Sequence, residues 1–304
     1  MNLKTFYETF PTEQVCREYL AERRWHGTPV CQHCQHTEKI YRYKDGRLYK
    51  CGVCRKQFTV TMGTVMESSK IPLQTWFLAA YIIAAHKKGI ASVQLAKDMG
   101  LTQKTAWFLL HRIRYGLGEN MFGKDEKLTG VVEADETFVG APEHIGKSGH
   151  RTNKIIVMGL HERGGRVKAQ QIDRADIELA NKVSNSVEHG SVLMTDEFST
   201  YKMLNHLYQH ETVNHSKKEY VRGVAHTNTI ENFWSVMQRG IYGIYHTVSK
   251  KHMNQYCNEF AYRHNTRKVS DNERFADAMM KLEGRLSYNK LTQKLTKRIV
   301  IRRK

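Results

Sequence analysis

The stretch VVEADETFVG, residues 131–140, is apolar at both ends and acidic in the middle. Its valines and phenylalanine favour a β-strand, and strands of this kind are normally buried on at least one face. Strand alternation places Glu133 and Asp135 on one face and Glu136 on the other. Buried carboxylates are costly without a positive partner. Arginine, lysine and a metal ion are all candidates for that partner, and the rest of the chain has to decide between them.

The sequence after this stretch alternates strands with helices. Further strands are predicted at 154–163, 167–173, 191–198 and 211–215, and helices at 176–188, near 200–208 and from about 228. A Gly-Gly pair at 164–165 favours a hairpin between two of the strands. This order predicts an α/β fold with a mixed sheet. In such a sheet we expect the first and fourth strands to lie side by side, so that Asp135 and Asp196 meet at one edge.

The composition points to a polyanion partner. The chain has 304 residues and a net charge of +18, from 48 Lys and Arg against 30 Asp and Glu. Such an excess indicates nucleic acid, with a basic surface of no such role as the alternative. The motifs described below favour double-stranded DNA. The longest apolar run, WFLAAYIIAA (76–85), is too short to span a bilayer, so we expect no membrane partner. The first residues have no signal-peptide core, and we expect a cytoplasmic, nucleoid-associated location.

Four of the six cysteines form two Cys-x2-Cys pairs, Cys31/Cys34 and Cys51/Cys54, with 16 residues between the pairs. Each pair can place two thiolates on one tetrahedral ion, and the intervening YRYKDGRLYK supplies a hairpin. This spacing predicts one zinc ion. Its role is structural, because four protein ligands leave no open coordination position. A redox pair or chance cysteines are the weaker alternatives.

The segment ASVQLAKDMGLTQKTAWFLLHRIR (91–114) predicts a helix-turn-helix. Ser92 is suited to cap the first helix, Gly100 permits the turn, and Thr102 is suited to cap the second helix. The second helix leaves five polar side chains for solvent or DNA, namely Gln103, Lys104, His111, Arg112 and Arg114. Residues near the start of such a helix normally meet base edges, so the first two are the predicted base contacts. An ordinary helical hairpin with a solvated basic face is the alternative.

A third acidic residue completes a candidate metal site. The segment HTNTIENFWSVMQRGIYGIY (226–245) carries an apolar helical stripe that suits the face of a sheet. Glu231 falls at the edge of that stripe, about 100° around the helix from Ile230. Together with Asp135 and Asp196 it offers the hard oxygen ligands that two Mg²⁺ or Mn²⁺ ions require.

Each acid also has a plainer interpretation. Glu133 or Glu136 could be the ligand in place of Asp135, and all three could be solvated residues at a sheet edge. Glu231 could be a first-turn acid that interacts favourably with the helix dipole. The triad is favoured over these alternatives because of where its three members fall in the predicted fold. Asp135 is on the first strand, Asp196 is at the end of the fourth strand, and Glu231 is on the helix that suits the face of the sheet.

These motifs, in this order, resemble the ribonuclease-H-like DDE transposases. With the cysteine ribbon, the segments VEADETFVG, TDEFSTY and HTNTIENFWSVMQRGIYG are similar to the zinc-ribbon transposases of bacterial insertion sequences, the group numbered fifteen-ninety-five. The resemblance covers roughly residues 10–268. It implies a DNA transposase of the bacterial cytoplasm whose catalytic, metal-binding triad is Asp135, Asp196 and Glu231.

The resemblance also implies a reaction. It is Mg²⁺-dependent strand cleavage at terminal inverted repeats, followed by joining to target DNA, both by in-line phosphoryl transfer. Pairing two element ends implies a homodimer or a higher assembly on DNA. The family often has lysine or arginine seven residues after the glutamate, whereas this chain has Gln238 there, followed by Arg239. A non-catalytic DNA-binding regulator and another ribonuclease-H-like nuclease are the alternative functions.

The chain is accordingly divided into an N-terminal helix (1–25), a zinc ribbon (26–62), a helix-turn-helix (70–120), a ribonuclease-H-like catalytic domain (126–268) and a basic C-terminal tail (269–304). Basic and polar side chains of the catalytic domain are predicted to contact DNA phosphates. They are Lys147, Arg151, Lys154, Lys217, Lys218, Gln238 and Arg239.

Overall fold

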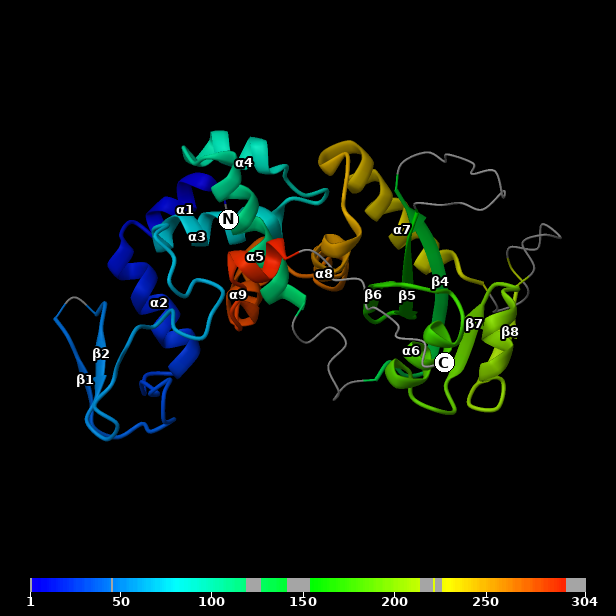
Figure 1. The fold of residues 1–304 in the computed structure, drawn as a ribbon, viewed down its shortest axis with the longest axis horizontal. Coiled ribbons are helices and arrows are strands. Elements are labelled where there is room, and N and C mark those ends of the chain that lie inside the picture. The colour runs from blue at the N-terminus through cyan, green and yellow to red at the C-terminus, as the bar shows by residue number, and fades with distance from the viewer. Residues whose placement is uncertain are drawn as a thin grey trace, which may run out of the picture.

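The structure, a computed structural model, describes residues 2–44, 46–118, 127–140, 154–213, 221 and 226–293. Figure 1 shows two bodies side by side: one is built from the N-terminal half and helix α9 (Asp271–Lys281), and the other surrounds a central sheet. Helix α8 (Met253–Asn265) lies between them. In the part of the chain that is described, no helix is both long and apolar enough to cross a bilayer.

The sheet of the second body has five strands. They are β4 (Val131–Val139), β5 (Ile155–Glu162), β6 (Val167–Ile172), β7 (Val192–Thr195) and β8 (Gln209–Thr212). Their order across the sheet is β6-β5-β4-β7-β8, with β5 antiparallel and β7 parallel to both of their neighbours. The predicted α/β fold with a mixed sheet is confirmed, with the first and fourth strands, β4 and β7, side by side.

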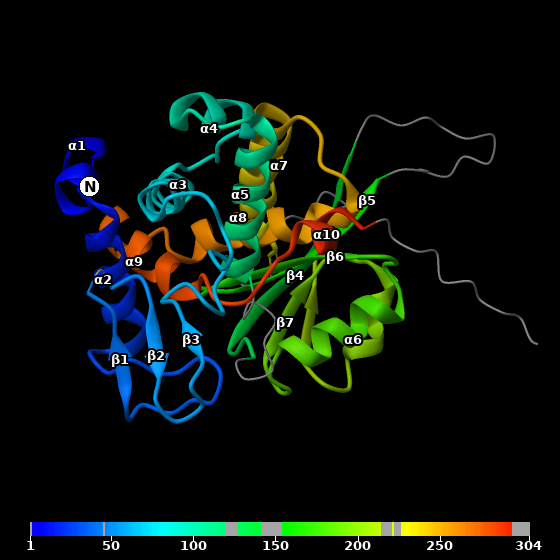
Figure 2. The same cartoon turned by 60° about the vertical axis from the view of Figure 1, so that its left-hand side comes forward.

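Helices cover both faces of this sheet, because its strands alternate apolar side chains between two cores (Figure 2). On one face, α6 (Ile177–Ser186) and the 3-10 helix η1 (Ser199–Leu204) pack in a cluster that includes Leu160. On the other face, α7 (Asn228–Gly240) and α8 pack in a cluster that includes Val157. Helix α7 begins at the residue that the sequence indicated, and its apolar stripe faces the sheet as expected.

The first body is a helical bundle. Its helices are α1 (Leu3–Thr9), α2 (Glu13–Trp25), α3 (Leu73–Ala85), α4 (Ser92–Met99) and α5 (Gln103–Gly118). The chain start forms two helices rather than the single one expected, because the Thr12 hydroxyl accepts the N–H of Val15 at 3.3 Å and starts α2 there. Phe10, between the two helices, packs edge-on against Phe77 at 5.1 Å between ring centroids.

The segment expected to be a basic tail instead contributes to this bundle. Ser270 starts helix α9 with a capping box to Glu273. Phe275 in α9 is buried, with its ring centroid 5.6 Å from that of Phe10 and 5.9 Å from that of Phe77. The prediction of a tail from residue 269 is therefore wrong for α9. Basic residues near the chain end dominate the composition there, and they obscure a short amphipathic helix.

A buried ion cluster joins the two bodies. Glu259 on α8 pairs with Arg114 on α5 and with Arg263 one turn further along α8, and the three side chains are 0%, 1% and 7% exposed. Burial raises the pKa of Glu259, but the two arginines outweigh it and lower the pKa to about 2. The carboxylate is therefore ionised at neutral pH and fixes α5 against α8.

Candidate active site

Asp135 lies in the middle of β4 and is held by a tryptophan from α7. The indole Nε1 of Trp234 donates a hydrogen bond to Oδ2 of Asp135 at 2.9 Å. The residue opposite Asp135 on β5 is Gly159, where a Cβ atom would lie 2.5 Å from Cζ2 of Trp234. Glycine at this position makes room for the indole, and the indole orients the carboxylate.

Glu133, two residues earlier on β4, anchors the start of α7. Its Oε2 accepts the backbone N–H groups of Thr229 at 2.9 Å and Ile230 at 3.0 Å, and its Oε1 accepts the Nε–H of Arg163 at 2.8 Å. The side chain is fully buried. A carboxylate at a helix N-terminus is stabilised by the helix dipole as well as by these bonds. Because protein donors occupy both oxygens, Glu133 is a poor alternative to Asp135 as a metal ligand.

A third side-chain contact joins β4 to α7, after those of Glu133 and Asp135. Nε2 of Gln238 donates to Oγ1 of Thr137 at 2.9 Å. Residues 133, 135 and 137 of β4 thus meet residues 230, 234 and 238 of α7. Two residues of strand advance about 6.6 Å and four residues of helix about 6 Å, so the spacings match. This β4–α7 register sets the position of Glu231, one residue after the first contact.

Glu231 lies in the exposed first turn of α7. Its Oε1 accepts a hydrogen bond from the Thr227 hydroxyl at 2.8 Å. The neighbouring residue Ile230 is fully buried against the sheet, so Glu231 projects from the flank of the helix, about 100° away. The Glu231 side chain is exposed at the surface of the sheet body.

Asp196 comes directly after β7, the strand that pairs with β4. Its Oδ1 accepts the backbone N–H of Phe198 at 3.0 Å. Burial, followed by the charges of Glu136 and Asp196, raises the pKa of Asp135 to about 7. Burial also raises the pKa of Glu136 to about 7, against a hydrogen bond from the Tyr201 hydroxyl at 2.8 Å. Beyond burial, the charge of Asp196 therefore disfavours ionisation of both Asp135 and Glu136.

The carboxylate oxygens of Asp135, Asp196 and Glu231 do not all lie within 4.8 Å of one another. Across the described ranges, the four ribbon cysteines are the only group of three or more potential metal ligands whose ligand atoms all lie within 4.8 Å of one another. Asp135 and Asp196 share an electrostatic environment, whereas Glu231 stands on the adjoining helix. The triad therefore stays a prediction that rests on the order and register of these elements.

The ribbon contains a small three-stranded sheet, β1 (Ile40–Arg42), β2 (Tyr49–Cys51) and β3 (Gln57–Phe58). Cys51 ends β2 and Cys54 lies in the turn after it, whereas Cys31 and Cys34 lie in the segment before β1. Their sulfurs approach closely, with Sγ–Sγ distances of 3.6 Å between Cys31 and Cys54 and 3.7 Å between Cys34 and Cys51. Zinc–sulfur bonds of about 2.3 Å in a tetrahedron give an edge of about 3.8 Å. The arrangement is consistent with the predicted structural zinc.

We expect purified protein to contain about one zinc ion per chain. Stripping that ion with a chelator should unfold the ribbon and leave the sheet body folded, because the two have separate cores. Elemental analysis measures the zinc content. Unfolding of the ribbon is followed by tryptophan fluorescence, because Trp25 packs against Tyr49 of the ribbon. Metal-free protein with an intact ribbon would contradict the assignment.

Helices α4 and α5 have the predicted turn, in which Gly100 is left-handed with φ 62° and the Thr102 hydroxyl accepts the N–H of Thr105 at 3.3 Å. Ser92 does not cap α4. Its hydroxyl accepts a hydrogen bond from Gln103 at 3.0 Å. In the first turn of α5 both predicted base contacts, Gln103 and Lys104, are exposed.

The prediction that Arg112 and Arg114 face DNA is wrong. Arg112 is 6% exposed, donates to the carbonyl oxygen of Glu67 at 2.7 Å, and lies over the ring of Trp76. Arg114 is committed to the buried ion cluster described above. His111, also expected on the polar face, is fully buried, and burial lowers its pKa to about 2. Helix α8 and the segment before α3 cover this part of α5.

The predicted phosphate contacts are only partly within the described structure. Lys147, Arg151, Lys217 and Lys218 lie outside the described residues. Lys154 is half-buried just before β5, and Arg239 is exposed near the end of α7. Gln238 is committed to Thr137, so it acts in the β4–α7 register in this structure.

Comparison with known proteins adds to this geometry. The ISXO2-like transposase domain matches residues 127–265, which contain the sheet and all three predicted acids. The transposase zinc-ribbon domain matches residues 11–57. Both matches fall in the order that the resemblance implied. The chain belongs to the ISXO2-like family of zinc-ribbon DDE transposases.

One relative of this transposase is a protein of Halobacterium salinarum described as an uncharacterized protein in the transposable element ISH50. The two are 28% identical over 282 residues, which cover 84% of this chain and 92% of the relative.

Two solved structures of the Mos1 transposase are also similar. A pre-cleavage transpososome has 11% identity and a TM-score of 0.25, covering 63% of this chain and 71% of that one. A paired-end complex with the left transposon end has 10% identity and a TM-score of 0.27, covering 68% and 75%. At such scores the likeness carries no weight for the fold, which stands on the strand order.

Sequence reasoning about this transposase missed the supporting residues. From the sequence, Glu133 is only a rival metal ligand, and Trp234 is only one residue of the apolar stripe in 226–245. A signal was available, because strand positions 133, 135 and 137 share one face and helix positions 230, 234 and 238 share another. Pairing those two rows would have identified the β4–α7 register.

Proposed function

We propose that the transposase cleaves DNA at the terminal inverted repeats of its element and joins the freed ends to target DNA, with Asp135, Asp196 and Glu231 as catalytic residues. The observation that carries this proposal is the β4–α7 register, which couples the helix of Glu231 to the strand of Asp135. The parallel pairing of β4 with β7 supports the third position, Asp196.

The donor set suits two Mg²⁺ or Mn²⁺ ions, because these ions prefer carboxylate oxygens. Burial, and after it the charge of Asp196, raises the pKa of both Asp135 and Glu136, and a divalent cation beside these carboxyl groups would favour their ionised forms. When bound, two such ions would activate the attacking oxygen and stabilise the leaving oxygen. The chain's own contribution is to orient each carboxylate through the indole, backbone and hydroxyl donors described above.

Several features support DNA as the partner. The chain has a net charge of +18, and α5 presents Gln103 and Lys104 in its first turn, where helix-turn-helix proteins meet base edges. Because the middle of α5 is buried, we propose that base contacts are confined to that turn. Arg239 and the basic stretches outside the described residues are proposed to contact phosphates. Joining two ends requires at least two copies of the chain on DNA.

A strand-transfer assay tests this function. Labelled element-end DNA, supercoiled target DNA and Mg²⁺ should yield cleaved ends and joined products, and a chelator of divalent ions should prevent both. A regulator would bind the ends without nicking, and a nuclease would cut without joining. Either pattern in protein with full zinc content would reject the proposal.

A further inference from the structure

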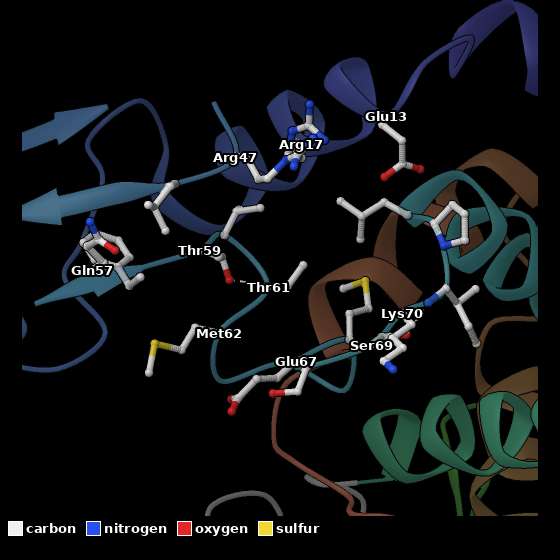
Figure 3. A pocket seen from close by; sticks show the side chains of 18 residues that line it. Glu13, Arg17, Arg47, Gln57, Thr59, Thr61, Met62, Glu67, Ser69 and Lys70 are labelled. Atoms are coloured by element: carbon white, nitrogen blue, oxygen red, sulfur yellow. Dashed lines mark hydrogen bonds between the residues drawn. The ribbon is translucent and has the colours of Figure 1, made fainter. Parts of the chain in front are cut away.

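A large cavity lies where the zinc ribbon meets the helical bundle. It has a volume of about 910 Å³, and its walls come from α2, from the edge strand β3 with the hairpin turn before β2, and from the segment 59–72 that leads into α3. Figure 3 shows these walls around the open space, with side chains of each pointing toward it. The cavity plays no part in the active site on the sheet.

The rim of this cavity is cationic. Arg17 comes from α2, Arg47 from the ribbon hairpin and Lys70 from the segment before α3. Two acids also line it, but protein donors engage both. Glu13 accepts the N–H of Gln74 at 2.9 Å. Glu67 accepts the N–H of Gly63 at 2.9 Å and pairs with Arg285 at 3.0 Å. The rim therefore carries three cations from three separate segments against two acids, one of which is paired with Arg285.

The floor between these cations is largely apolar. It includes Val60, Met62, Met66 and Leu73, with the paired hydroxyls of Thr59 and Thr61, 3.0 Å apart, at one side. A ligand that matches such a surface carries anionic groups at intervals along a less polar chain. The sugar–phosphate backbone of DNA has this pattern, and phosphates are the groups to which Lys and Arg mainly bind on DNA.

A second, smaller cavity continues this surface to the helix-turn-helix. It has a volume of about 260 Å³, and residues 68–71 line both cavities. Its opposite wall is the first half of α5, with Lys104, Thr105 and Phe108. Lys70 therefore stands between the ribbon cation Arg47 and the predicted base-contacting turn of α5. A DNA duplex bound at that turn could therefore extend along residues 68–71 to the ribbon.

We propose that the ribbon and the helix-turn-helix form one continuous DNA surface, in which Arg47 and Lys70 bind phosphodiester groups of the same duplex that the first turn of α5 reads. The ribbon then acts as a clamp on DNA beside the bases that specify the element end. This inference rests on the proposed function, because it names where the element-end DNA of that function lies.

The test measures DNA affinity against salt for Arg47→Ala and Lys70→Ala. A phosphate contact contributes about 0.9 to the slope of log affinity against log salt, so each variant should lower the slope by about one. Affinity near 0.1 M salt should fall roughly fivefold to tenfold, equally for element-end and random DNA. Lys4→Ala is the matched control, because Lys4 is exposed on α1 and lines neither cavity. Unchanged zinc content and thermal midpoint establish that each variant is folded.

Unchanged slopes in both variants would overturn the clamp while leaving the proposed function standing, provided that the unaltered protein binds element ends and Lys104→Ala weakens that binding. Failure of the unaltered protein to bind element ends would reject the proposed function and the clamp together. Unchanged DNA slopes with loss of binding to a labelled oligoglutamate peptide would also overturn the clamp, in favour of an acidic protein partner.

Discussion

Glu231→Gln is expected to reduce Mg²⁺-dependent cleavage of element ends by more than about a hundredfold. The substitution removes one negative charge from the predicted metal site and keeps the shape of the side chain. It also leaves an oxygen to accept the hydrogen bond from Thr227. Helix α7 should stay docked, because its anchor is Glu133 and not Glu231. Single-turnover cleavage of labelled end DNA measures the loss.

The control for this variant is Glu188→Gln. Glu188 is an exposed glutamate beyond α6 whose backbone bonds to Leu128 and Ser191, so the same chemical change in its side chain should leave cleavage unaltered. DNA affinity and thermal midpoint should match the unaltered protein in both variants. Normal cleavage by Glu231→Gln would show that the metal site does not include this residue.

The local patterns of the sequence were sufficient for the sheet and the ribbon. Strand β4 was recognisable because valines and phenylalanine flank its acids, and the pairing of β4 with β7 followed from the order of elements. The ribbon followed from cysteine spacing alone, since two Cys-x2-Cys pairs need only a hairpin to meet. In each case the structure depends on neighbours close in sequence or on one simple topological rule.

Long-range contacts explain what the sequence could not supply. Arg112 and Arg114 sit at positions that look solvent-facing on an isolated helix. The partner of Arg114 is Glu259, 145 residues later in the chain, and the sequence around α5 does not indicate this partner. Helix α9 escapes a local pattern for the same reason, because Phe275 completes an aromatic cluster with Phe6 and Phe10 near the chain start and Phe77 on α3. A charged residue on a helix is buried or exposed according to elements that a local pattern does not contain.

Glu133→Gln is expected to lower the free energy of unfolding by about 3 kcal/mol. The glutamate is fully buried, so the change removes its ion pair with Arg163 and a negative charge from the N-terminus of α7. Cleavage by the folded variant should fall by about a hundredfold, because a shift of about 1 Å in α7 displaces Glu231 from its productive position. Urea unfolding and single-turnover cleavage below the unfolding transition measure the two effects separately.

The matched control is Glu162→Gln on the adjacent strand β5. Glu162 accepts the N–H of Thr129 at 3.0 Å near the surface. Removing its charge should lower the free energy of unfolding by less than about 1 kcal/mol and leave cleavage intact. A Glu133→Gln protein that unfolds and cleaves like the unaltered one would mean that α7 is held by its apolar stripe alone. In that case the β4–α7 register would not be what positions Glu231. The stability measurement therefore bears on the active site as directly as the cleavage assay does.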